Sequence, residues 1–522
     1  MTYDAIVVGA GHNGLACALH MATRGWKVLV LEQADSPGGA VKTAEVTLPG
    51  FRHDLYAMNL SMFAGSPFHA EHGQLLAKHG LEFVGASKPF ASVFPSAKEP
   101  EWLGVEQGLD ATVKHIARVS TRDAEAWRCM DQRFEREAPH IFSLLGSPVP
   151  SWQLAKGLWN MWRALGVSGM AETARLLMSS PRSWLEGQFE SDTVRSLLAT
   201  WGLHLDFGPD VAGGALFPYL EAMLGQRFGM TLGRGGADTI VRSMVSALQG
   251  AGGEVRTGAR VRRILATGGK VQGVELEGGE RITARRAVVA NVHPKALYGG
   301  LLGNEAPVGS ESARALRPGP ATMMIHLALE ALPEWGAGRE LQSFAYVHLA
   351  PSLDHMAKVY AQALAGVLPE EPVLVVGQPT VFDPSRAPVG KHILWVQVRV
   401  LPSRPISDAA STLAAGPWDG IKEAYADRVL DILERYAPGL RQSVLARCVL
   451  SPEDLERDNP NLVGGDSLSG SHHLDQFFAF RPSFGRARWR TGVEGLFHIG
   501  ASTWPGAGTG AGSGYMLARD LT

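Results

Sequence analysis

Three glycines near the start of the chain have the spacing of a nucleotide-binding turn. Gly9, Gly11 and Gly14 follow the mostly apolar run 4–8, which is short and β-branched like a buried parallel strand. The first glycine permits the tight turn, the second lets a pyrophosphate approach the main chain, and the third lets the next helix pack closely on the strand. That helix, expected over 15–23, directs its free N–H groups and the positive end of its dipole at the phosphates. The spacing therefore predicts a dinucleotide site.

An acidic residue at the end of a second strand indicates which dinucleotide binds. The apolar run 28–31 ends at Glu32, eighteen positions after Gly14 and directly before Gln33. A carboxylate there can accept hydrogen bonds from both ribose hydroxyls, which favours an adenine dinucleotide without a 2′-phosphate. The pair Gly38-Gly39 then places a second turn without side chains beside the phosphates. NAD domains do not usually need that second turn, so the sequence predicts FAD.

The end of the chain repeats the arrangement of strand, glycine-rich turn and helix. A strand is expected over 496–499, a glycine-rich turn over 500–512 and a helix over 515–520. The N-terminus of that helix can lie under the pyrimidine end of a flavin, where it would stabilise negative charge. Both ends of the chain are thus predicted to meet at one cofactor.

Composition excludes several classes of protein. The formal net charge is −2 over 522 residues and no long Lys or Arg run occurs, which excludes the footprint of a nucleic-acid binder. The three cysteines form no CxxC pair and no metal-ligand spacing, so neither a redox dithiol nor a metal site is expected. No apolar stretch reaches the eighteen or more residues of a membrane span. We expect a cytoplasmic protein, with peripheral membrane contact left open.

The order of predicted elements indicates a chain that leaves its first domain and returns. Helical periodicity with recurrent Trp and Leu runs from 110 to about 227, and strand-like runs follow between about 321 and 400. Such a sheet would floor a substrate cavity. The sequence therefore predicts an α/β fold, in which a Rossmann-type FAD-binding domain is interleaved with an α+β substrate domain. The predicted domain boundaries are 1–80, 228–300 and 456–522 for the FAD-binding domain, and 81–227 and 301–455 for the substrate domain.

A second glycine cluster could be taken for another nucleotide turn. Gly233, Gly235 and Gly236 stand close together, but neither a good preceding strand nor a ribose carboxylate accompanies them. A nicotinamide domain is therefore not expected. Reduced flavin would instead pass its electrons to an external acceptor such as oxygen or a quinone.

The stretch 152–163 allows two interpretations. Apolar residues cover much of its helical surface, while Lys156 and Arg163 add positive charge. It could be a lid lying on a bilayer, with the two cations meeting anionic head groups. It could equally be a buried helix of the substrate domain. We favour burial, in which case Trp159→Ala would leave a cavity and lower stability by roughly 3–5 kcal/mol.

Over its full length the chain resembles the phytoene-desaturase-related flavoproteins, including the branch called pyridine nucleotide-disulfide oxidoreductase domain-containing protein 2. The matching stretches are the first glycine turn with Glu32 and Gly38-Gly39, 255–261, 451–455, Asp475-Gln476-Phe477-Phe478 with Arg481-Pro482, and 495–508. The first and last stretches are specific to this FAD fold, and the Asp-Gln-Phe-Phe passage points to the branch.

The resemblance implies where the cofactor lies. The main chain at Val261 would bind the adenine, and Asn291 lies in a passage that ends a strand of the FAD-binding domain. FAD would be held without a covalent bond, since no Cys or His stands in a recognised attachment motif. The residues predicted to bind the cofactor are Gly9, Gly11, His12, Asn13, Gly14, Glu32, Gln33, Gly38, Gly39, Ala40, Val261, Asn291, Gly500, Ala501, Gly508, Thr509 and Gly510.

The resemblance also implies a reaction. Hydride would pass between a carbon of a hydrophobic small molecule, isoprenoid- or polyene-like, and flavin N5, in C–C desaturation or saturation. Such chemistry needs few protein acids or bases. Tyr56, His473 and Asp475 are the polar residues expected nearest the flavin, where structural hydrogen bonding is the alternative role for each. An amine oxidase shares the fold and would need an aromatic pair beside the flavin. A redox-neutral flavin isomerase and a flavin-binding protein without turnover stay as further alternatives, and the oligomeric state is left open.

Overall fold

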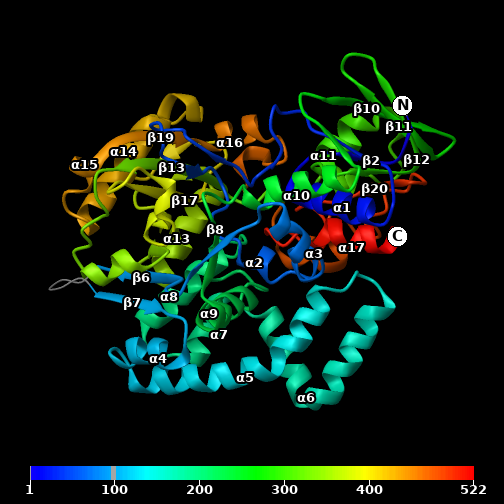
Figure 1. Ribbon diagram of the computed structural model, residues 1–522. Coiled ribbons are helices and arrows are strands. Elements are labelled where there is room, and N and C mark those ends of the chain that lie inside the picture. Colours follow the sequence, from blue (N-terminus) through cyan, green and yellow to red (C-terminus); the bar gives the residue numbers. More distant parts are fainter. Residues whose placement is uncertain (1, 96–100) are drawn as a thin grey trace.

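The computed structural model describes residues 2–95 and 101–522, and the strands of these residues form two large sheets (Figure 1). In the first sheet the strand order is β10-β11-β12-β1-β2-β9, and β20 pairs with β12. Its strands are β1 (Thr2–Val8), β2 (Val28–Leu31), β9 (Glu254–Arg256), β10 (Val261–Thr267), β11 (Lys270–Leu276), β12 (Arg281–Ala290) and β20 (Leu496–His498). β1 lies parallel to β2 and β12, and β2 lies parallel to β9. Parallel strands bring their carboxyl ends to one edge, where ligands of open α/β sheets bind.

Helices connect and cover the strands of the first sheet. They are α1 (His12–Thr23), α3 (Pro67–Lys78), α10 (Thr239–Gly250) and α17 (Gly512–Leu521). The apolar residues of α1, α10 and α17 belong to the same buried cluster as strand residues such as Val7 and Val30. The expected helices after both glycine turns are thus confirmed, and this half of the molecule is a Rossmann-type α/β fold.

The second sheet is mostly antiparallel, with the strand order β19-β13-β17-β16-β14-β6-β7. Its strands are β6 (Phe90–Phe94), β7 (Glu101–Val105), β13 (Ala321–Leu329), β14 (Tyr346–Leu349), β16 (Val373–Gly377), β17 (His392–Leu401) and β19 (Val444–Leu450). Only the β14–β6 pair among the strands of this sheet is parallel within the described residues. Apolar residues of α14 (Trp418–Tyr436) join the core of this sheet, and α13 (Leu353–Leu364) lies against β17.

The predicted helical region is confirmed. It consists of α4 (Leu109–Ala117), α5 (Thr121–Leu145), α6 (Trp152–Met178), α7 (Pro181–Gln188), α8 (Asp192–Leu203) and α9 (Leu216–Phe228), of which α4, α5 and α6 lie along the bottom of Figure 1. Shorter elements complete the described chain: β3 (Thr43–Ala44), β4 (His53–Asp54), β5 (Phe83–Ala86), β8 (Met230–Gly233), α2 (Ser61–Ala64), α11 (Pro294–Ala296), α12 (Glu311–Arg314), β15 (Val367–Leu368), β18 (Ser407–Asp408), α15 (Leu440–Ser443) and α16 (Pro452–Asp458).

The two sheets divide the chain without sharing a strand. All strands of the first sheet fall within 1–80, 228–300 and 456–522, and all strands of the second fall within 81–227 and 301–455. The small β5–β8 sheet crosses this division. We keep these ranges as our proposal for two domains.

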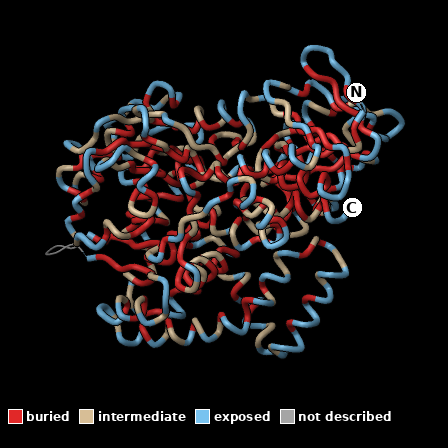
Figure 2. Tube along the Cα trace, in the orientation of Figure 1, coloured by how far each residue is buried: buried red, intermediate tan, exposed pale blue. Residues whose placement is uncertain are grey.

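Helix α6 corrects a prediction, because its apolar side chains face outward. Trp159 is 57% exposed and Trp152 is 84% exposed, and their rings pack into no core cluster of the described chain. Figure 2 shows α6 largely pale blue, in contrast to the sheets. The helix breaks at Gly166, where φ is +68°, and it touches α5 near Gly157. The preference for a buried helix was wrong, because α6 contacts its neighbour along one narrow stripe only.

None of the helices formed by the described residues has the length and apolar character needed to span a bilayer.

Candidate functional site

The first glycine turn has no room for side chains. Gly9 has φ +96°, and a Cβ there would lie 2.8 Å from the main-chain oxygen of Asn291. A Cβ at Gly14 would lie 2.3 Å from the main-chain oxygen of Gly9. Asn291, directly after β12, donates from Nδ2 to the same oxygen of Gly9 at 3.2 Å and so ties the turn to the next strand. The close packing of α1 on β1 thus depends on glycine at both positions.

Helix α1 begins at this turn, and no side chain accepts a hydrogen bond from its first main-chain N–H groups. Its N-cap is Gly11, and no side chain caps it. His12 and Asn13 follow and line a cavity. The Nε2 atom of His12 lies 3.0 Å from the main-chain oxygen of Gly508, and burial lowers the pKa of His12 to about 4. The imidazole is therefore uncharged at neutral pH, and the positive end of the helix dipole supplies the attraction for phosphate.

Glu32 stands directly after β2, where its carboxylate organises two turns. Oε2 accepts the main-chain N–H of Ala10 at 2.8 Å, and Oε1 accepts that of Ala34 at 3.0 Å. The side chain lines the same cavity as Gly9 and Val261. A carboxylate held in this way lies at the carboxyl edge of the sheet, the position at which ribose hydroxyls are recognised.

The glycine pair packs against the first turn. Gly38 has φ +135° and donates its main-chain N–H to the oxygen of Ala10 at 3.0 Å. Gly39 has φ +60°, and a Cβ there would lie 3.2 Å from Cα of Gly11. Two turns without side chains therefore lie face to face, which leaves main-chain groups accessible to a pyrophosphate.

The C-terminal turn closes the same site from the other end of the chain. Ser513, at the start of α17, accepts the main-chain N–H of Gly500 at 3.0 Å and donates from Oγ to Oδ1 of Asn13 at 3.0 Å. A Cβ at Gly514 would lie 1.9 Å from the main-chain oxygen of Asn13. The starts of α1 and α17 are thereby in direct contact.

Two connected cavities lie along these turns. The edge cavity, of about 400 Å³, follows the carboxyl ends of β1 and β2 and the start of β10. The central cavity, of about 280 Å³, extends from the glycine turns to the second sheet. The residues that line both are Gly11, Gly39, Asn291, Val292, Asn459 and Asn461. A long ligand could therefore occupy the two cavities together.

Most residues predicted to bind the cofactor line one of these cavities. The residues in the edge cavity are Gly9, Gly11, Glu32, Gln33, Gly39, Val261 and Asn291. The residues in the central cavity are Gly11, His12, Asn13, Gly39, Ala40, Asn291, Gly500, Ala501, Gly508 and Thr509. Gly14, Gly38 and Gly510 line neither cavity, and their place is in the packing of the turns behind the lining. Uncapped helix starts, bare turns and the Glu32 carboxylate together fit the diphosphate and ribose of FAD.

The far wall of the central cavity comes from the second sheet and two helices. Trp395, Gln397 and Arg399 alternate along β17 and present one face, beside Tyr346 of β14. Trp201 and His204 from the end of α8 and Glu221 from α9 line the wall as well. Burial raises the pKa of Glu221 to about 7. These residues were not predicted from the sequence. Their only sequence signal was that Gln397 and Arg399, two polar residues, stand at alternate positions of the otherwise apolar strand β17.

Tyr56 is the one of the three predicted polar residues that lines the central cavity. Its hydroxyl donates to Oδ2 of Asp458, which also pairs with Lys42 at 2.8 Å. Burial, followed by this hydrogen bond, raises the pKa of Tyr56 above its usual range. Its main-chain oxygen accepts from Nε1 of Trp395 at 3.1 Å. The phenol therefore stays protonated and joins the loop after β4 to the second sheet.

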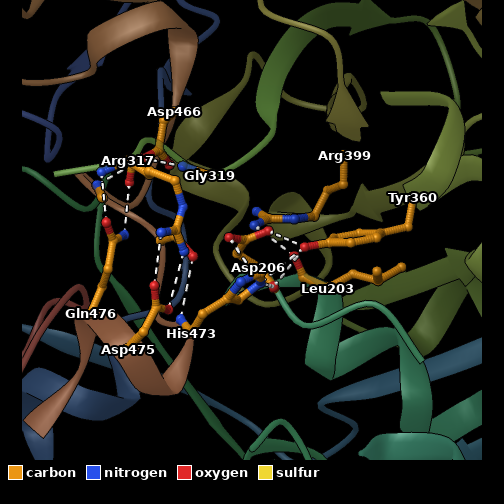
Figure 3. Close-up of polar contacts among 12 residues, drawn as sticks. Leu203, Asp206, Arg317, Gly319, Tyr360, Arg399, Asp466, His473, Asp475 and Gln476 are labelled. Carbon is orange, nitrogen blue, oxygen red and sulfur yellow. Dashed lines mark hydrogen bonds and ion pairs between the residues drawn. The ribbon is translucent and has the colours of Figure 1, made fainter. Parts of the chain in front are cut away.

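His473 and Asp475 line neither cavity. Figure 3 shows both side chains beside their polar neighbours. Nε2 of His473 lies 2.8 Å from the main-chain oxygen of Asp206 and 3.0 Å from the hydroxyl of Tyr360. Asp475 forms a two-pronged ion pair with Arg317, with distances of 2.8 and 3.1 Å. Both side chains fasten the segment before the C-terminal turn to other parts of the chain. These hydrogen bonds and the ion pair are sufficient to explain why a histidine and an aspartate stand at positions 473 and 475.

The second glycine cluster is filled by the protein itself. The main-chain N–H of Gly235 donates to Oδ2 of Asp383 at 2.6 Å, and a Cβ at Gly236 would lie 2.3 Å from Oγ1 of Thr43. A short strand, β8, does precede the cluster, contrary to our expectation. The donors of this loop are nevertheless directed at side chains of the protein.

The fold and the paired cavities define an FAD-dependent oxidoreductase, with a Rossmann-type cofactor cleft that opens into a cavity walled by a second sheet. The chain belongs to the family of flavin containing amine oxidoreductases, whose sequence pattern matches residues 14–398. This match confirms the predicted cofactor, FAD.

Relatives support the same assignment along the whole chain. The pyridine nucleotide-disulfide oxidoreductase domain-containing protein 2 of Rattus norvegicus is 29% identical over 561 residues, covering 99% of this chain and 94% of that protein. The phytoene desaturase (neurosporene-forming) of Cereibacter sphaeroides is 25% identical over 545 residues, with 99% and 94% covered. The crystal structure of an oxidoreductase from Methanosarcina mazei has a TM-score of 0.64 at 17% identity, with 100% of both chains covered. The predicted resemblance to phytoene-desaturase-related flavoproteins is confirmed.

Proposed function

We propose that this oxidoreductase desaturates or saturates a C–C bond in an isoprenoid- or polyene-like, hydrophobic small molecule: hydride passes between one carbon and flavin N5, and a proton leaves or joins the neighbouring carbon. When bound, FAD supplies the hydride-accepting atom. The similarity to a phytoene desaturase supports an apolar substrate. The protein would contribute orientation and a cavity from which water is excluded.

The observation that carries this proposal is the composition of the central cavity. Aromatic and apolar side chains such as Trp395, Tyr346, Met324 and Phe217 form much of its wall. The phenol of Tyr56 is occupied by Asp458 and stays protonated, so it is not a free base. A largely aromatic and apolar wall of this kind suits a hydrocarbon substrate, and Glu221 is an ionisable group in it.

An amine oxidase is the second candidate, and the family name alone supports it. Such an enzyme would need two aromatic faces that enclose an amine beside the flavin. One aromatic pair of the central cavity is Tyr346 and Trp395, whose rings stack on each other with centroids 5.5 Å apart and an interplanar angle of 23°. Rings in mutual contact leave no slot between them, which argues against capture of an amine there.

Anaerobic titration of the yellow holoenzyme tests these alternatives. Bleaching of the flavin absorbance by polyenes such as phytoene, and none by primary amines such as putrescine, would support the proposal. Bleaching by amines alone would replace it with an amine oxidase. A change in polyene double-bond geometry without bleaching would indicate an isomerase, and no effect of either class would favour a flavin-binding protein without turnover.

We further propose that an external acceptor, oxygen or a quinone, reoxidises the flavin. The second glycine cluster is occupied by Asp383 and Thr43, so it offers no nicotinamide site. NADH and NADPH should therefore reduce the flavin slowly and without saturation in stopped-flow measurements. Fast, saturable reduction by either nucleotide would contradict this proposal.

A further inference from the structure

Arg399 is a buried cation in the wall of the central cavity. It stands on β17, is 6% exposed and shares its face of the strand with Trp395 and Gln397. Burial lowers the pKa of Arg399 to about 10, so the guanidinium still carries its charge at neutral pH. A buried charge ordinarily has a partner of opposite sign.

The described residues provide Arg399 with neutral partners only. Nη1 donates to Oε1 of Gln397 at 2.7 Å, and Nη2 donates to the main-chain oxygens of Leu203 and His204 at 3.2 and 2.9 Å. These oxygens belong to the C-terminal end of α8, whose dipole compensates part of the charge. No carboxylate of the described chain lies within 4.0 Å of the guanidinium, and Glu221 of the same cavity makes no ion pair with it.

The nearest acidic groups are committed elsewhere. Asp206 accepts from the hydroxyl of Tyr360 at 2.8 Å and lies beside His473. Asp466 accepts main-chain N–H groups, including that of Gly319 at 2.9 Å. Figure 3 shows Arg399 and Leu203 on one side of the Asp206 cluster and the Arg317–Asp475 pair on the other. Asp466 and Asp206 therefore act on the charge of Arg399 from a distance only, and neither carboxylate is in hydrogen-bond contact with the guanidinium.

Further unpaired polar atoms stand in the same wall. Nε of Arg399, Nε1 of Trp201 and Nε2 of His204 are buried without a hydrogen-bond partner in the described structure, and all three residues line the central cavity. The rings of Trp201 and His204 lie 4.6 Å apart, next to the carbonyls that bind Arg399. Indole and guanidinium nitrogens can only donate. Unpaired donors beside one cavity indicate an acceptor that comes with the ligand.

The backbone of β17 is distorted at the same place. Val400, the residue after Arg399, has φ +60°, which a β-branched residue rarely adopts. The pairing with β13 shifts there, because Ala321 faces Leu401 whereas Met323 faces Val398. Bulges of this kind redirect a side chain, and they occur next to binding sites.

We propose that the substrate is an apolar molecule with a carboxylate, and that Arg399 and Trp201 bind this carboxylate while the aromatic wall holds the hydrocarbon. This inference rests on the proposed function, since it names the substrate class of the same cavity. The guanidinium supplies the counter-charge and its unused Nε–H, and the indole supplies a second donor. The reacting carbon would then be selected by its distance from the carboxylate.

Binding of matched acids and alcohols to the holoenzyme tests the proposal. The probes are geranic acid with geraniol, farnesoic acid with farnesol, and retinoic acid with retinol, titrated anaerobically by the perturbation of the FAD spectrum. At least one acid should bind tenfold or more tightly than its alcohol. Arg399→Met should remove this preference without loss of FAD, and Arg399→Lys should keep part of it. Equal affinities throughout the series would overturn the proposal, and so would a preference that survives in Arg399→Met.

Two further variants distinguish binding from a structural role. Trp201→Phe keeps the ring and removes only the donor, so the preference for the acid should fall severalfold even if Arg399→Met does not fold. Arg317→Met removes an arginine that lines neither cavity and pairs with Asp475, and it should leave the preference unchanged. An unchanged preference in Trp201→Phe would remove the indole from the site. The titration measures binding and needs no turnover. If the acids bind but the flavin absorbance does not bleach, the carboxylate site is supported and the proposed hydride transfer is contradicted.

Discussion

The edge cavity and the central cavity are built from different parts of the polypeptide. The edge cavity depends on main-chain groups at turns where glycine is required, and Glu32 accepts main-chain N–H groups of two of these turns. The central cavity depends on side chains that project from β17, α8 and α9. A main-chain site tolerates no added Cβ, whereas a side-chain site can change residue by residue. The edge cavity therefore admits few substitutions at its turns, whereas the central cavity can change one side chain at a time.

The largest effect is expected from a methyl group in the first glycine turn. In Gly14→Ala the new Cβ would meet the main-chain oxygen of Gly9 at 2.3 Å, so α1 must move away from β1. We expect the purified variant to contain essentially no FAD, measured by absorbance at 450 nm after purification. Gly187→Ala in α7 is the matched control, since nothing lies within 4 Å of its Cβ, and it should keep its FAD. If the Gly14→Ala protein retained FAD, the edge cavity would not depend on glycine at this turn, and the contrast between the two cavities would be wrong.

Loss of the Glu32 carboxylate should have a smaller effect. Glu32→Ala removes the acceptor for the main chain of Ala10 and Ala34, and with it the group that we predict to bind the ribose. FAD binding should weaken by the value of one or two hydrogen bonds to a charged group, roughly 1.5–3 kcal/mol each. Fluorescence titration of the apoprotein with FAD measures this change, and Glu32→Gln should lose less. Unchanged affinity would exclude Glu32 from the ribose site.

The second sheet should respond to acid through a buried imidazole. His326 of β13 is fully buried, and burial, together with nearby His53, lowers its pKa to about 3. The unfolded chain binds a proton near pH 6.5 and the folded chain does not, so stability is lost as pH falls from about 6.5 towards 3, by about 1.4 kcal/mol per unit. The difference in free energy of unfolding between His326→Leu and the wild-type protein should therefore shift in favour of the variant by about 2 kcal/mol from pH 8 to pH 5. Parallel thermal melts of both proteins at the two pH values check this, and identical pH dependence would contradict it.

The smallest effect on stability is expected at α6, which belongs to neither cavity. Trp159→Ala should change the free energy of unfolding by less than about 0.5 kcal/mol, as at other exposed positions. The matched variant Trp127→Ala in α5 removes a buried indole that donates to Gln226 at 2.5 Å, and should cost about 3–5 kcal/mol. Thermal melts compare the two variants.

Exposure of α6 also makes its membrane interpretation testable. If Trp159, Lys156 and Arg163 meet a bilayer, liposomes with anionic lipid should carry the protein upward in flotation, in a manner that salt reverses. Trp159→Ala should then lose flotation while it stays folded. Equal flotation of both proteins, or none, would contradict membrane contact through this helix.

What could be predicted from the sequence follows from the same contrast. Glycine turns and Glu32 occupy the ends of β1 and β2 as their spacing requires, because main-chain recognition demands fixed residue types at fixed intervals. Arg399 gave no such signal. Its partners Leu203 and His204 lie 196 and 195 positions earlier, and only the folded chain brings them together. The family resemblance placed His473 and Asp475 near the flavin, whereas the structure pairs them with Asp206 and Arg317.

The contact between Asn13 and Ser513 also sets an order of events during synthesis. The two residues are 500 positions apart, yet their hydrogen bond joins the two helix starts of the cofactor site. At about 5–20 residues per second, the ribosome makes Ser513 roughly 25–100 s after Asn13. The first strands can form early, but the cleft is closed only once α17 has left the ribosome. Until then the growing chain carries half of a nucleotide site, so FAD can be enclosed only after α17 has been made.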